Sequence, residues 1–352
     1  MIVVKAAIAA MTVGAGCLLV GCTSAAVSGG RPPASPHTAG APARAAPPSA
    51  ATGASRPSAA TRPVLRASLE PWQLPRAVSR EVVLPAGSRL DILGGLRSQD
   101  STTSEVTVVD SAGRSAAARP LARASHDAAG VIVAGRAMVF GGGSAASQSW
   151  IQERTASGAW DVVGHLPTVR SDLAAVTVRG RAYVLGGYDG TRLSSSVLRV
   201  SSTGRAAVVG RLPVPVRYAA VARVGNEIWV VGGLARSGPT AVVQRFDVAT
   251  ARGSVVGRLR RPVQGAVAVV LGGRLFVCGG VVHGSPTAQV FRVDPSTGRV
   301  ARAGRLPGPV SYAGVTELGG AAYLVGGETP APSARVMRLR LAFVPASTRG
   351  RR

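Results

Sequence analysis

The sequence predicts an all-β fold, a six-bladed β-propeller with four-stranded blades, and three observations lead to this prediction. First, Gly-Gly doublets recur at intervals of 47, 45, 46, 47 and 47 residues: Gly94-Gly95, Gly141-Gly142, Gly186-Gly187, Gly232-Gly233, Gly279-Gly280 and Gly326-Gly327. Second, each doublet ends a pair of apolar runs that a short turn separates. Third, no repeat contains a helical stretch. A period of this length is typical of propeller and solenoid arrays, and four strands per period give one blade per repeat.

The first two strands of each repeat are predicted to form a hairpin. The clearest copies run from Arg170 to Gly187 and from Arg217 to Gly233. Their turns contain the glycine dipeptides that tight antiparallel hairpins require: Gly135-Arg136, Gly180-Arg181, Gly225-Asn226, Gly272-Gly273 and Gly319-Gly320. Three positions before the doublet, five copies have a large side chain, namely Met138, Tyr183, Trp229, Phe276 and Tyr323, and the exception is Asp91. We expect these large side chains to fill the space between neighbouring sheets.

A third and a fourth strand follow each doublet. The third strands are predicted at Val106–Asp110, Val197–Ser201, Val242–Asp247 and Gln289–Asp294. The fourth strand runs into a Gly-Arg/His-Leu-Pro segment at 164–167, 210–213 and 304–307, whereas 257–260 lacks the proline. Because proline cannot donate a hydrogen bond to a sheet ladder, we expect these segments to cross between blades.

This order of elements resembles the kelch repeat. From about Leu65 to Val344 the elements follow one another in this order: an arginine, an alternating apolar strand, a glycine turn, an aromatic-x-x-Gly-Gly segment, a loop, a strand ending in Asp and an outer strand. The tryptophan of the kelch outer strand is present once, as Trp160, and Ala or Val replaces it elsewhere. The resemblance implies a kelch-like propeller, a fold that usually serves as a binding module.

The sixth repeat is incomplete and requires a strand from elsewhere. After Gly326-Gly327 the sequence has one clear strand, 335–341. Residues 64–69 alternate apolar and polar side chains and precede Leu74, which lies 47 residues before Leu121 in register with the segments between blades. We expect this N-terminal strand to complete the last blade, which removes the open sheet edges that invite aggregation. The alternative is that 64–69 is linker.

The first 21 residues are predicted to be a signal peptide. Lys5, the only lysine of the chain, precedes an apolar stretch from Ala6 to Gly21, which is typical of export signals. The stretch is shorter than the ~20 residues that a membrane-spanning helix needs. It ends in Leu-Val-Gly-Cys22, which resembles the bacterial lipobox, whereas Cys17 lies within the apolar stretch.

The lipobox resemblance implies cleavage before Cys22 and attachment of a lipid to its sulfur. Because two or three acyl chains hold a protein on a membrane effectively permanently, we expect a lipoprotein on the outer, extracytoplasmic face of the cell membrane. Residues 22–63 are then a linker rich in Ala, Pro and Ser, without an acidic residue, and this composition predicts disorder. The propeller is predicted at 64–345, followed by a basic tail at 346–352.

The chain is strongly basic, with a formal net charge of +25. Residues 64–345 hold 33 arginines and all 16 acidic residues, a formal charge of +17. A basic balance often indicates nucleic-acid binding, but an exported lipoprotein meets little nucleic acid. We therefore expect no nucleic-acid partner, and an unidentified protein, an anionic envelope polymer or lipid headgroups instead. The alternative is that the arginines, many of them at hairpin turns, are solvated and reflect composition alone.

Candidate ligand-binding residues gather at the expected mouth of a central channel. The loops that enter the first strands contribute His126, Asp127, Arg170, Asp172, Arg217, Tyr218, Gln264, Ser311 and Tyr312. The loops after the doublets contribute Tyr188, Asp189, Arg192, His283 and Glu328.

Two pairs of charged residues within this set permit alternative interpretations. Arg170 and Arg217 match the arginine that begins the kelch unit and can bind a carboxylate or phosphate bidentately. Alternatively, they pair with Asp127 or Asp172 across blades. Asp127 and Asp172 occupy equivalent positions in adjacent repeats, and two carboxylates so placed can serve acid–base chemistry. Their alternative role is also ion pairing.

No cofactor and no metal site are predicted. None of the four histidines, His37, His126, His165 and His283, has a partner at ligand spacing. Copper-dependent galactose oxidases share kelch blades, but they require a Tyr/Cys cofactor pair and two histidines. Cys278 lies on a predicted core strand and is expected to be a small buried apolar residue. Exported six-bladed kelch proteins also include sialic-acid mutarotases, yet no catalytic motif here matches residue by residue.

We therefore expect a non-catalytic binding module rather than an enzyme. The alternative is a carbohydrate-active enzyme, mutarotase-like or envelope-glycan-processing, with its site at the channel mouth. A third possibility is a structural spacer. Unpaired arginines and acids at the mouth favour an enzyme or a small ligand, whereas complete mutual pairing with apolar patches on the blade loops favours a protein partner.

Overall fold

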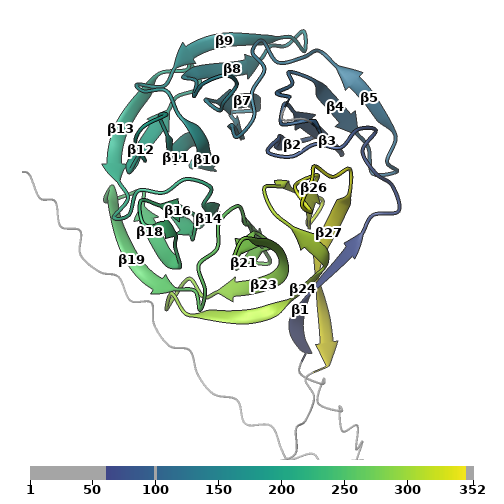
Figure 1. The fold of residues 1–352 in the computed structure, drawn as a ribbon, viewed down its shortest axis with the longest axis vertical. Helices are drawn as coiled ribbons and strands as arrows, with labels where there is room; N and C mark the ends of the chain where they lie inside the picture. Colours follow the sequence, from purple (N-terminus) through teal and green to yellow (C-terminus); the bar gives the residue numbers. More distant parts are fainter. Residues whose placement is uncertain (1–60, 99–100, 346–352) are drawn as a thin grey trace, which may run out of the picture. The chain divides into compact units, whose positions relative to one another are not determined.

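The computed structural model describes residues 61–98 and 101–345. Within these residues the regular elements are strands, and they form six four-stranded antiparallel sheets arranged in a ring (Figure 1). The predicted all-β, six-bladed propeller is thus confirmed. The predicted signal peptide, Cys22, most of the linker and the basic tail lie outside the described residues. In the described part of the chain no helix is long and apolar enough to span a membrane.

Blades 1 to 3 each use four consecutive strands, numbered from the channel outward. Blade 1 consists of β2 (Val82–Ala86), β3 (Arg89–Leu93), β4 (Val106–Val109) and β5 (Ser115–Ala118). Blade 2 consists of β6 (Ala129–Val133), β7 (Arg136–Phe140), β8 (Trp150–Arg154) and β9 (Trp160–His165). Blade 3 consists of β10 (Ser171–Val178), β11 (Arg181–Tyr188), β12 (Ser196–Val200) and β13 (Ala206–Arg211).

Blades 4 and 5 carry small additions after the glycine doublet. Blade 4 consists of β14 (Ala220–Val224), β15 (Glu227–Val231), β18 (Val242–Asp247) and β19 (Arg252–Arg258), and its doublet loop forms the hairpin of β16 (Leu234–Ala235) and β17 (Gly238–Pro239). Blade 5 consists of β20 (Val267–Leu271), β21 (Arg274–Cys278), β23 (Ser285–Val293) and β24 (Val300–Val310). The short β22 (Val281–Val282) pairs with the beginning of β23.

Blade 6 joins the two ends of the propeller. It consists of β25 (Gly314–Leu318), β26 (Ala321–Val325), β27 (Val336–Pro345) and, as the outermost strand, β1 (Thr61–Leu69). β1 pairs with β27 without a break from Thr61↔Pro345 to Leu69↔Met337, and the two strands are drawn side by side in Figure 1. The predicted closure by an N-terminal strand is confirmed, although β1 begins at Thr61 rather than at Val64.

The glycine doublets are contacts between blades. Both glycines of every doublet have positive φ, from 56° to 67° at the first and from 83° to 100° at the second. The second glycine donates its N–H to a backbone carbonyl of the next blade at 2.8–3.0 Å, including Gly327 to Val78 across the closure. A Cβ on the first glycine would lie 2.4–2.6 Å from that same carbonyl oxygen. Positive φ and this close approach explain why glycine recurs at both positions.

The apolar core is divided into six clusters, one at each contact between neighbouring blades, which we call seams. The leucine that ends each repeat is buried in all six blades: Leu74, Leu121, Leu166, Leu212, Leu259 and Leu306. Leu74 therefore has the in-register position that the sequence predicts.

One expectation about the outer strands is wrong. Pro167 and Pro213 follow the ends of β9 and β13, as predicted, but Pro307 lies inside β24 rather than at a crossing between blades. The pairing of β24 with β23 shifts in register next to this proline, between Thr287 and Gln289. Because proline offers no N–H, it is tolerated where the ladder is already irregular.

Candidate functional site

Six equivalent residues, one from each blade, form a closed backbone ring at one end of the channel. These residues, which we call the mouth ring, are Arg80, Asp127, Asp172, Tyr218, Gly265 and Tyr312, with φ from 50° to 62°. Each N–H donates to the carbonyl of the ring residue in the preceding blade at 2.8–3.0 Å, and Arg80 closes the circle by donating to Tyr312. Five of the six are not glycine, although non-glycine residues rarely adopt this conformation. Such strain is typical of functional sites.

The mouth ring directs its side chains into a cavity of about 100 Å³ on the channel axis. A second cavity of about 190 Å³ continues from it between the innermost strands, and its walls are mostly alanine and valine. Gly265 has no side chain because the Tyr312 ring occupies that space: a Cβ on Gly265 would lie 2.6 Å from Tyr312 Cε1. The polar groups of the channel are thus concentrated at the mouth.

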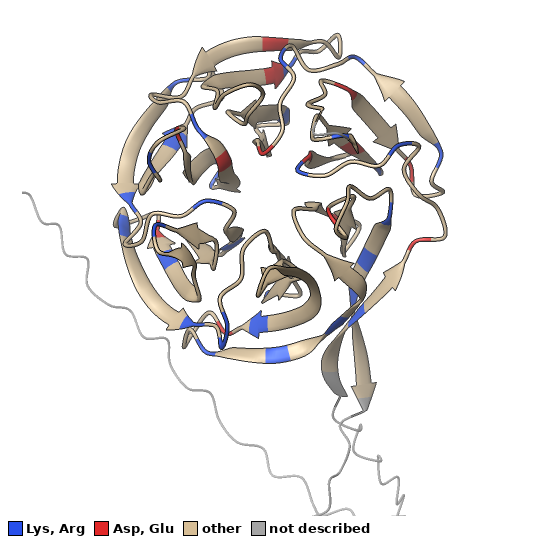
Figure 2. Ribbon diagram, viewed as in Figure 1, with Lys and Arg blue, Asp and Glu red and all other residues tan. Residues whose placement is uncertain are grey.

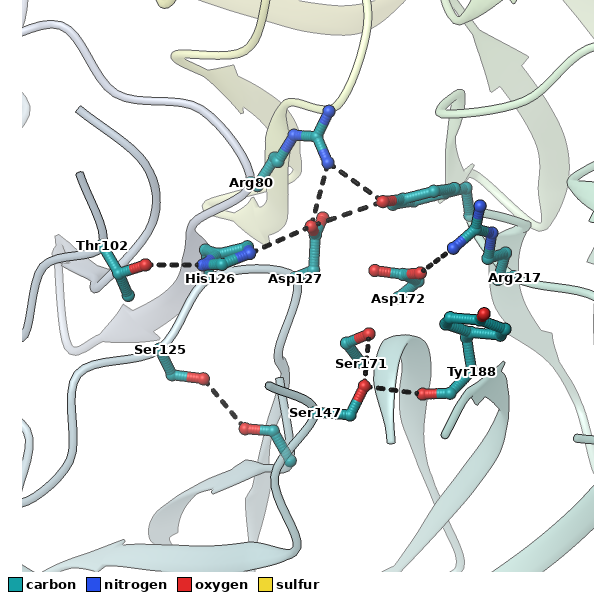
Figure 3. A network of polar contacts seen from close by, with 12 residues as sticks. Arg80, Thr102, Ser125, His126, Asp127, Ser147, Ser171, Asp172, Tyr188 and Arg217 are labelled. Carbon is teal, nitrogen blue, oxygen red and sulfur yellow. Dashed lines mark hydrogen bonds and ion pairs between the residues drawn. The ribbon is translucent and has the colours of Figure 1, made fainter. Parts of the chain in front are cut away.

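Arg80 connects the side chains of four blades. Its guanidinium donates to Asp127 Oδ2 at 3.0 Å, to Glu328 Oε1 at 2.8 Å and to the Tyr218 hydroxyl at 3.0 Å. It also lies 4.5 Å from the centroid of the Tyr312 ring, a distance at which a cation and an aromatic face attract. Figure 3 shows the Arg80 side chain above Asp127. This guanidinium is the centre of the mouth's polar network.

A second ion pair lies beside the first. Arg217 donates to Asp172 Oδ2 at 3.1 Å, and the Asp172 side chain is only 3% exposed. The Arg217 guanidinium also lies 4.7 Å from the centroid of the Tyr188 ring. Figure 3 shows Arg217 beside Asp172 and above Tyr188. The predicted alternative that Arg217 pairs across blades is confirmed.

The burial of these groups shifts their protonation. Burial, with a contribution from the nearby Asp172 carboxylate, raises the pKa of Asp127 to about 7 despite the opposing attraction of Arg80. Burial and the two carboxylates also raise the pKa of the Tyr218 phenol. Burial by itself lowers the pKa of Arg80, but Asp127 and Glu328 raise it on balance. The mouth therefore holds the charged guanidinium of Arg80 beside a carboxyl group whose pKa is raised toward neutral pH.

The family comparison agrees with this architecture. The model of the Kelch motif matches residues 170–203 and 262–306, which lie in blades 3 and 5. The same element order recurs in all six blades, and each is a four-stranded sheet. The chain is a six-bladed β-propeller that contains Kelch motifs.

Solved structures resemble the kelch propeller in fold. The structure of YjhT has a TM-score of 0.67 at 16% sequence identity, and the match covers 77% of this chain and 99% of that one. At this identity the likeness is one of fold alone. No curated protein sequence matches the chain.

Arg170 does not reach the mouth of the kelch propeller. The residue is 3% exposed, and its guanidinium donates to the Gly186 carbonyl at 3.2 Å and to the hydroxyls of Thr168 and Ser196. The expected pairing of Arg170 with Asp127 or Asp172 is therefore wrong. This arginine instead satisfies backbone and hydroxyl acceptors of its own blade.

Two further predicted residues, His126 and Gln264, lie next to the mouth ring. His126 Nδ1 is 2.8 Å from the Thr102 hydroxyl, and its Nε2 is 3.8 Å from Asp127 Oδ2. Gln264 donates to the Tyr312 hydroxyl at 2.8 Å, while its own buried carbonyl oxygen has no hydrogen-bond partner. Tyr218 and Tyr312 contact each other edge to face at 5.0 Å.

Sequence reasoning missed two residues of the channel, Arg80 and Glu81. Arg80 precedes Asp127 by 47 residues, so the repeat period could have identified it, but blade 1 lacks the large apolar or aromatic residue that marks the other hairpins. The Glu81 carboxyl lies directly below the mouth ring, where the other five blades have alanine or leucine. Its Oε1 accepts the Gly314 N–H at 2.9 Å, whereas its buried Oε2 has no hydrogen-bond partner. Burial raises the pKa of Glu81 to about 8.

A groove of about 1210 Å³ adjoins the mouth between blades 3 and 4. We call it the mouth-face groove. Tyr188 and Arg217 form its border with the mouth, the loop at 191–193 forms one wall, and the β16–β17 hairpin forms the other. Arg192 and Arg236 also line it, and both are exposed. In the described part of the chain Arg236 forms no ion pair.

The described residues contain no group of three or more His, Cys, Asp or Glu side chains arranged to hold a metal ion. Cys278 is 1% exposed within the core cluster between blades 5 and 6. Burial raises the pKa of its thiol to about 12. The prediction that Cys278 is a buried core residue is confirmed.

Proposed function

We propose that this chain is a lipoprotein, anchored through Cys22 at the outer face of the cell membrane, and that its kelch propeller is a non-catalytic binding module. Its partner is an acidic protein segment or an anionic envelope polymer that docks on the mouth face. The observation that carries the binding role is the mutual pairing of charges at the mouth. Asp127 and Glu328 both accept from Arg80, and Asp172 accepts from Arg217.

This pairing favours a binding surface over a catalytic centre. An acid–base catalyst needs a carboxyl group within reach of a substrate proton and free to exchange it. Here each of the three carboxylates has a guanidinium partner within 3.1 Å. Fully paired charges instead make a rigid surface whose side chains are fixed before a partner arrives, which lowers the cost of ordering on binding.

The mouth-face groove supplies the chemistry of recognition. Arg192 and Arg236 line the groove together with Leu193, Val214 and Leu234, so the groove combines positive charge with apolar lining. Such a surface suits a partner that carries carboxylates or phosphates, because guanidinium groups bind both in bidentate geometry. The large apolar side chains that are exposed lie mainly on the outer strands, which makes the groove the better docking surface on this face.

The anchoring part of the proposal rests on the lipobox at Leu19–Cys22. A Cys22→Ser variant, expressed in a bacterium that processes lipoproteins, tests it by membrane fractionation. We expect the wild-type chain in the membrane fraction and the variant outside it. Equal distribution of the two chains would remove the anchor from the proposal and leave the binding role untouched.

Affinity capture from native membranes tests the binding role. One bait is the full chain, the second carries Arg192→Ala and Arg236→Ala, and the control carries Arg205→Ala at an exposed hairpin turn of blade 3. We expect a partner that the first and third baits retain and the second loses. If the second bait retains the same partner, the docking surface is not this groove.

A second candidate function, a carbohydrate-active enzyme at the channel mouth, is favoured by one specific observation. Two carboxyl groups of the channel, Asp127 and Glu81, have pKa values of about 7 and about 8, which is suitable for proton transfer at neutral pH. NMR observation of anomer interconversion in a panel of acidic and neutral sugars tests this candidate. Acceleration that Glu81→Gln abolishes would replace the binding-module proposal.

A further inference from the structure

One of the six seams differs from the other five at a single pair of positions. In the regular seams, the large residue three positions before the doublet belongs to the same core cluster as an apolar residue of the next blade. These pairs are Met138 with Val200, Tyr183 with Phe246, Trp229 with Val293, Phe276 with Leu339 and Tyr323 with Val109. At the seam between blades 1 and 2, the corresponding pair is Asp91 and Arg154, which form an ion pair.

The strand registers establish that these positions are equivalent. In blade 2 Phe140 pairs with Ile151, and in blade 3 Leu185 pairs with Val197, so Arg154 and Val200 each lie three residues beyond the matching point. The core cluster of the first seam contains neither Asp91 nor Arg154. Two charged residues, one on each side of this seam, thus stand where the other five seams have an apolar pair.

A groove of about 1000 Å³ is lined by both residues of this ion pair, and we call it the first-seam groove. It lies between blades 1 and 2 on the face opposite the mouth, because its lining includes the hairpin turns at Gly87 and Gly135, whereas the doublets lie at the other ends of the strands. Val108, Ala118 and Trp160 provide apolar wall. The groove is therefore separate from the site at the mouth.

The charge in the first-seam groove is unbalanced. Asp91 pairs with Arg154, and Glu153 accepts from Arg136 at 2.9 Å. Arg89 and Arg119 line the same groove, are exposed, and form no ion pair within the described residues. Four guanidinium groups thus surround two carboxylates.

Arg154 is placed to bind a ligand from the base of this groove. Its Nη1 donates to Asp91, whose side chain is 3% exposed, while the Arg154 side chain itself is 33% exposed. The remaining N–H groups of a guanidinium held on one side by a buried carboxylate are fixed in direction, and they suit an oxyanion. A buried ion pair seldom stabilises a fold more than the apolar pair it replaces, so stability alone does not account for this seam.

We propose that the first-seam groove binds a small anionic ligand, in which a carboxylate or phosphate group contacts Arg154, Arg119 and Arg89 and an apolar body packs against Trp160 and its neighbours. Asp91 acts as a positioning residue that orients Arg154. The site is independent of the mouth and of the function proposed for it.

Fluorescence titration of the full chain with 8-anilinonaphthalene-1-sulfonate tests this proposal, because the probe joins an oxyanion to an apolar body. We expect saturable binding that inorganic phosphate or succinate displaces, and the stronger competitor identifies the preferred group. Arg89→Ala with Arg119→Ala is expected to weaken binding at least tenfold. Arg205→Ala, at an exposed turn elsewhere, is the matched control and should leave the affinity unchanged.

A second variant separates loss of binding from loss of folding. Asp91→Phe with Arg154→Leu reproduces the apolar pair that blade 5 and blade 6 form through Phe276 and Leu339. This variant should fold with an unchanged circular dichroism spectrum and lose the saturable component. Two results with the variants would overturn the proposal: wild-type affinity in Asp91→Phe with Arg154→Leu, or a loss of affinity in Arg205→Ala equal to that in Arg89→Ala with Arg119→Ala. Absence of saturable binding to the wild-type chain, or binding that neither anion displaces, would also overturn it.

Discussion

The Arg80 guanidinium lies 3.0 Å from Asp127 Oδ2, and this contact joins blade 2 to the residue that closes the mouth ring. Asp127 is almost fully buried, with a side chain 7% exposed. The same guanidinium contacts Glu328 of blade 6 and the Tyr312 ring. One side chain therefore pairs with two carboxylates and covers an aromatic face at the point where the first and last blades meet.

Arg80→Ala is expected to destabilise the propeller strongly. Removing one partner of a buried ion pair costs roughly 3–5 kcal/mol, and protonation of Asp127, whose pKa is already about 7 beside Arg80, recovers part of this cost at neutral pH. Urea unfolding of the full chain measures the loss. Arg80→Ala combined with Asp127→Ala removes both charges and should recover part of it. If the single variant loses no more than the double, the Arg80–Asp127 pair contributes little to the stability of the ring.

The pH dependence of stability should reveal Glu81. Its pKa rises from the ordinary value of 4.5 to about 8 in the folded chain. Between these values the folded state binds more protons than the unfolded state, so the free energy of unfolding falls as pH rises. The slope from this one group approaches about 1.4 kcal/mol per pH unit at most.

Urea unfolding at several pH values from 4.5 to 8 tests this expectation with two variants. Glu81→Gln keeps an oxygen for the Gly314 N–H and should flatten the slope. Asp161→Asn removes an exposed carboxyl of β9 and should leave the slope unchanged. A slope that is unchanged in Glu81→Gln would assign it entirely to other groups, such as Asp127, whose pKa is raised in the same direction.

The sequence predicted the repeat, the blade and the closure because each has a local signature. A Gly-Gly doublet is readable because positive φ and a carbonyl at 2.4–2.6 Å leave no room for another residue. The alternation of apolar and polar side chains along β1 likewise predicted a strand. Leu74 lies in register with the segments between blades, which predicted that this strand completes the last blade.

The side-chain network at the mouth was only partly predictable, because it depends on which way each side chain turns. Arg170 lies two residues before the mouth-ring residue of its blade, in the place that Val216 has in blade 4, and it turns into its own blade. Arg217 lies one residue before its mouth-ring residue and crosses to Asp172. The prediction that Pro307 lies at a crossing between blades was wrong for a related reason. The register shift that lets β24 continue through Pro307 is a property of its pairing with β23, which spacing alone does not reveal.

Replacing the Asp91–Arg154 pair by an apolar pair should stabilise the chain. Exchange of a buried ion pair for well-packed apolar side chains is often stabilising by roughly 1–4 kcal/mol. We therefore expect a higher melting temperature for Asp91→Phe with Arg154→Leu than for the wild-type chain. Arg154→Leu alone leaves Asp91 buried without its partner and should lower the melting temperature. A double variant less stable than the wild type would show that this seam is built for its ion pair.

The doublet glycines should be far less tolerant of substitution than the glycines of the hairpin turns. Gly186 and Gly180 provide a matched pair, since their φ angles are 66° and 69°. A Cβ on Gly180 meets nothing within 4 Å, whereas a Cβ on Gly186 would lie 2.6 Å from the Val216 carbonyl oxygen of the next blade. Gly180→Ala should therefore cost only the left-handed backbone penalty of roughly 1–2 kcal/mol. Gly186→Ala carries the same penalty and also forces blades 3 and 4 apart, with loss of the adjacent Gly187 to Val216 hydrogen bond. Urea unfolding of the two variants compares them directly, and equal losses would mean that the doublets recur for their backbone conformation alone and not for the contact between blades.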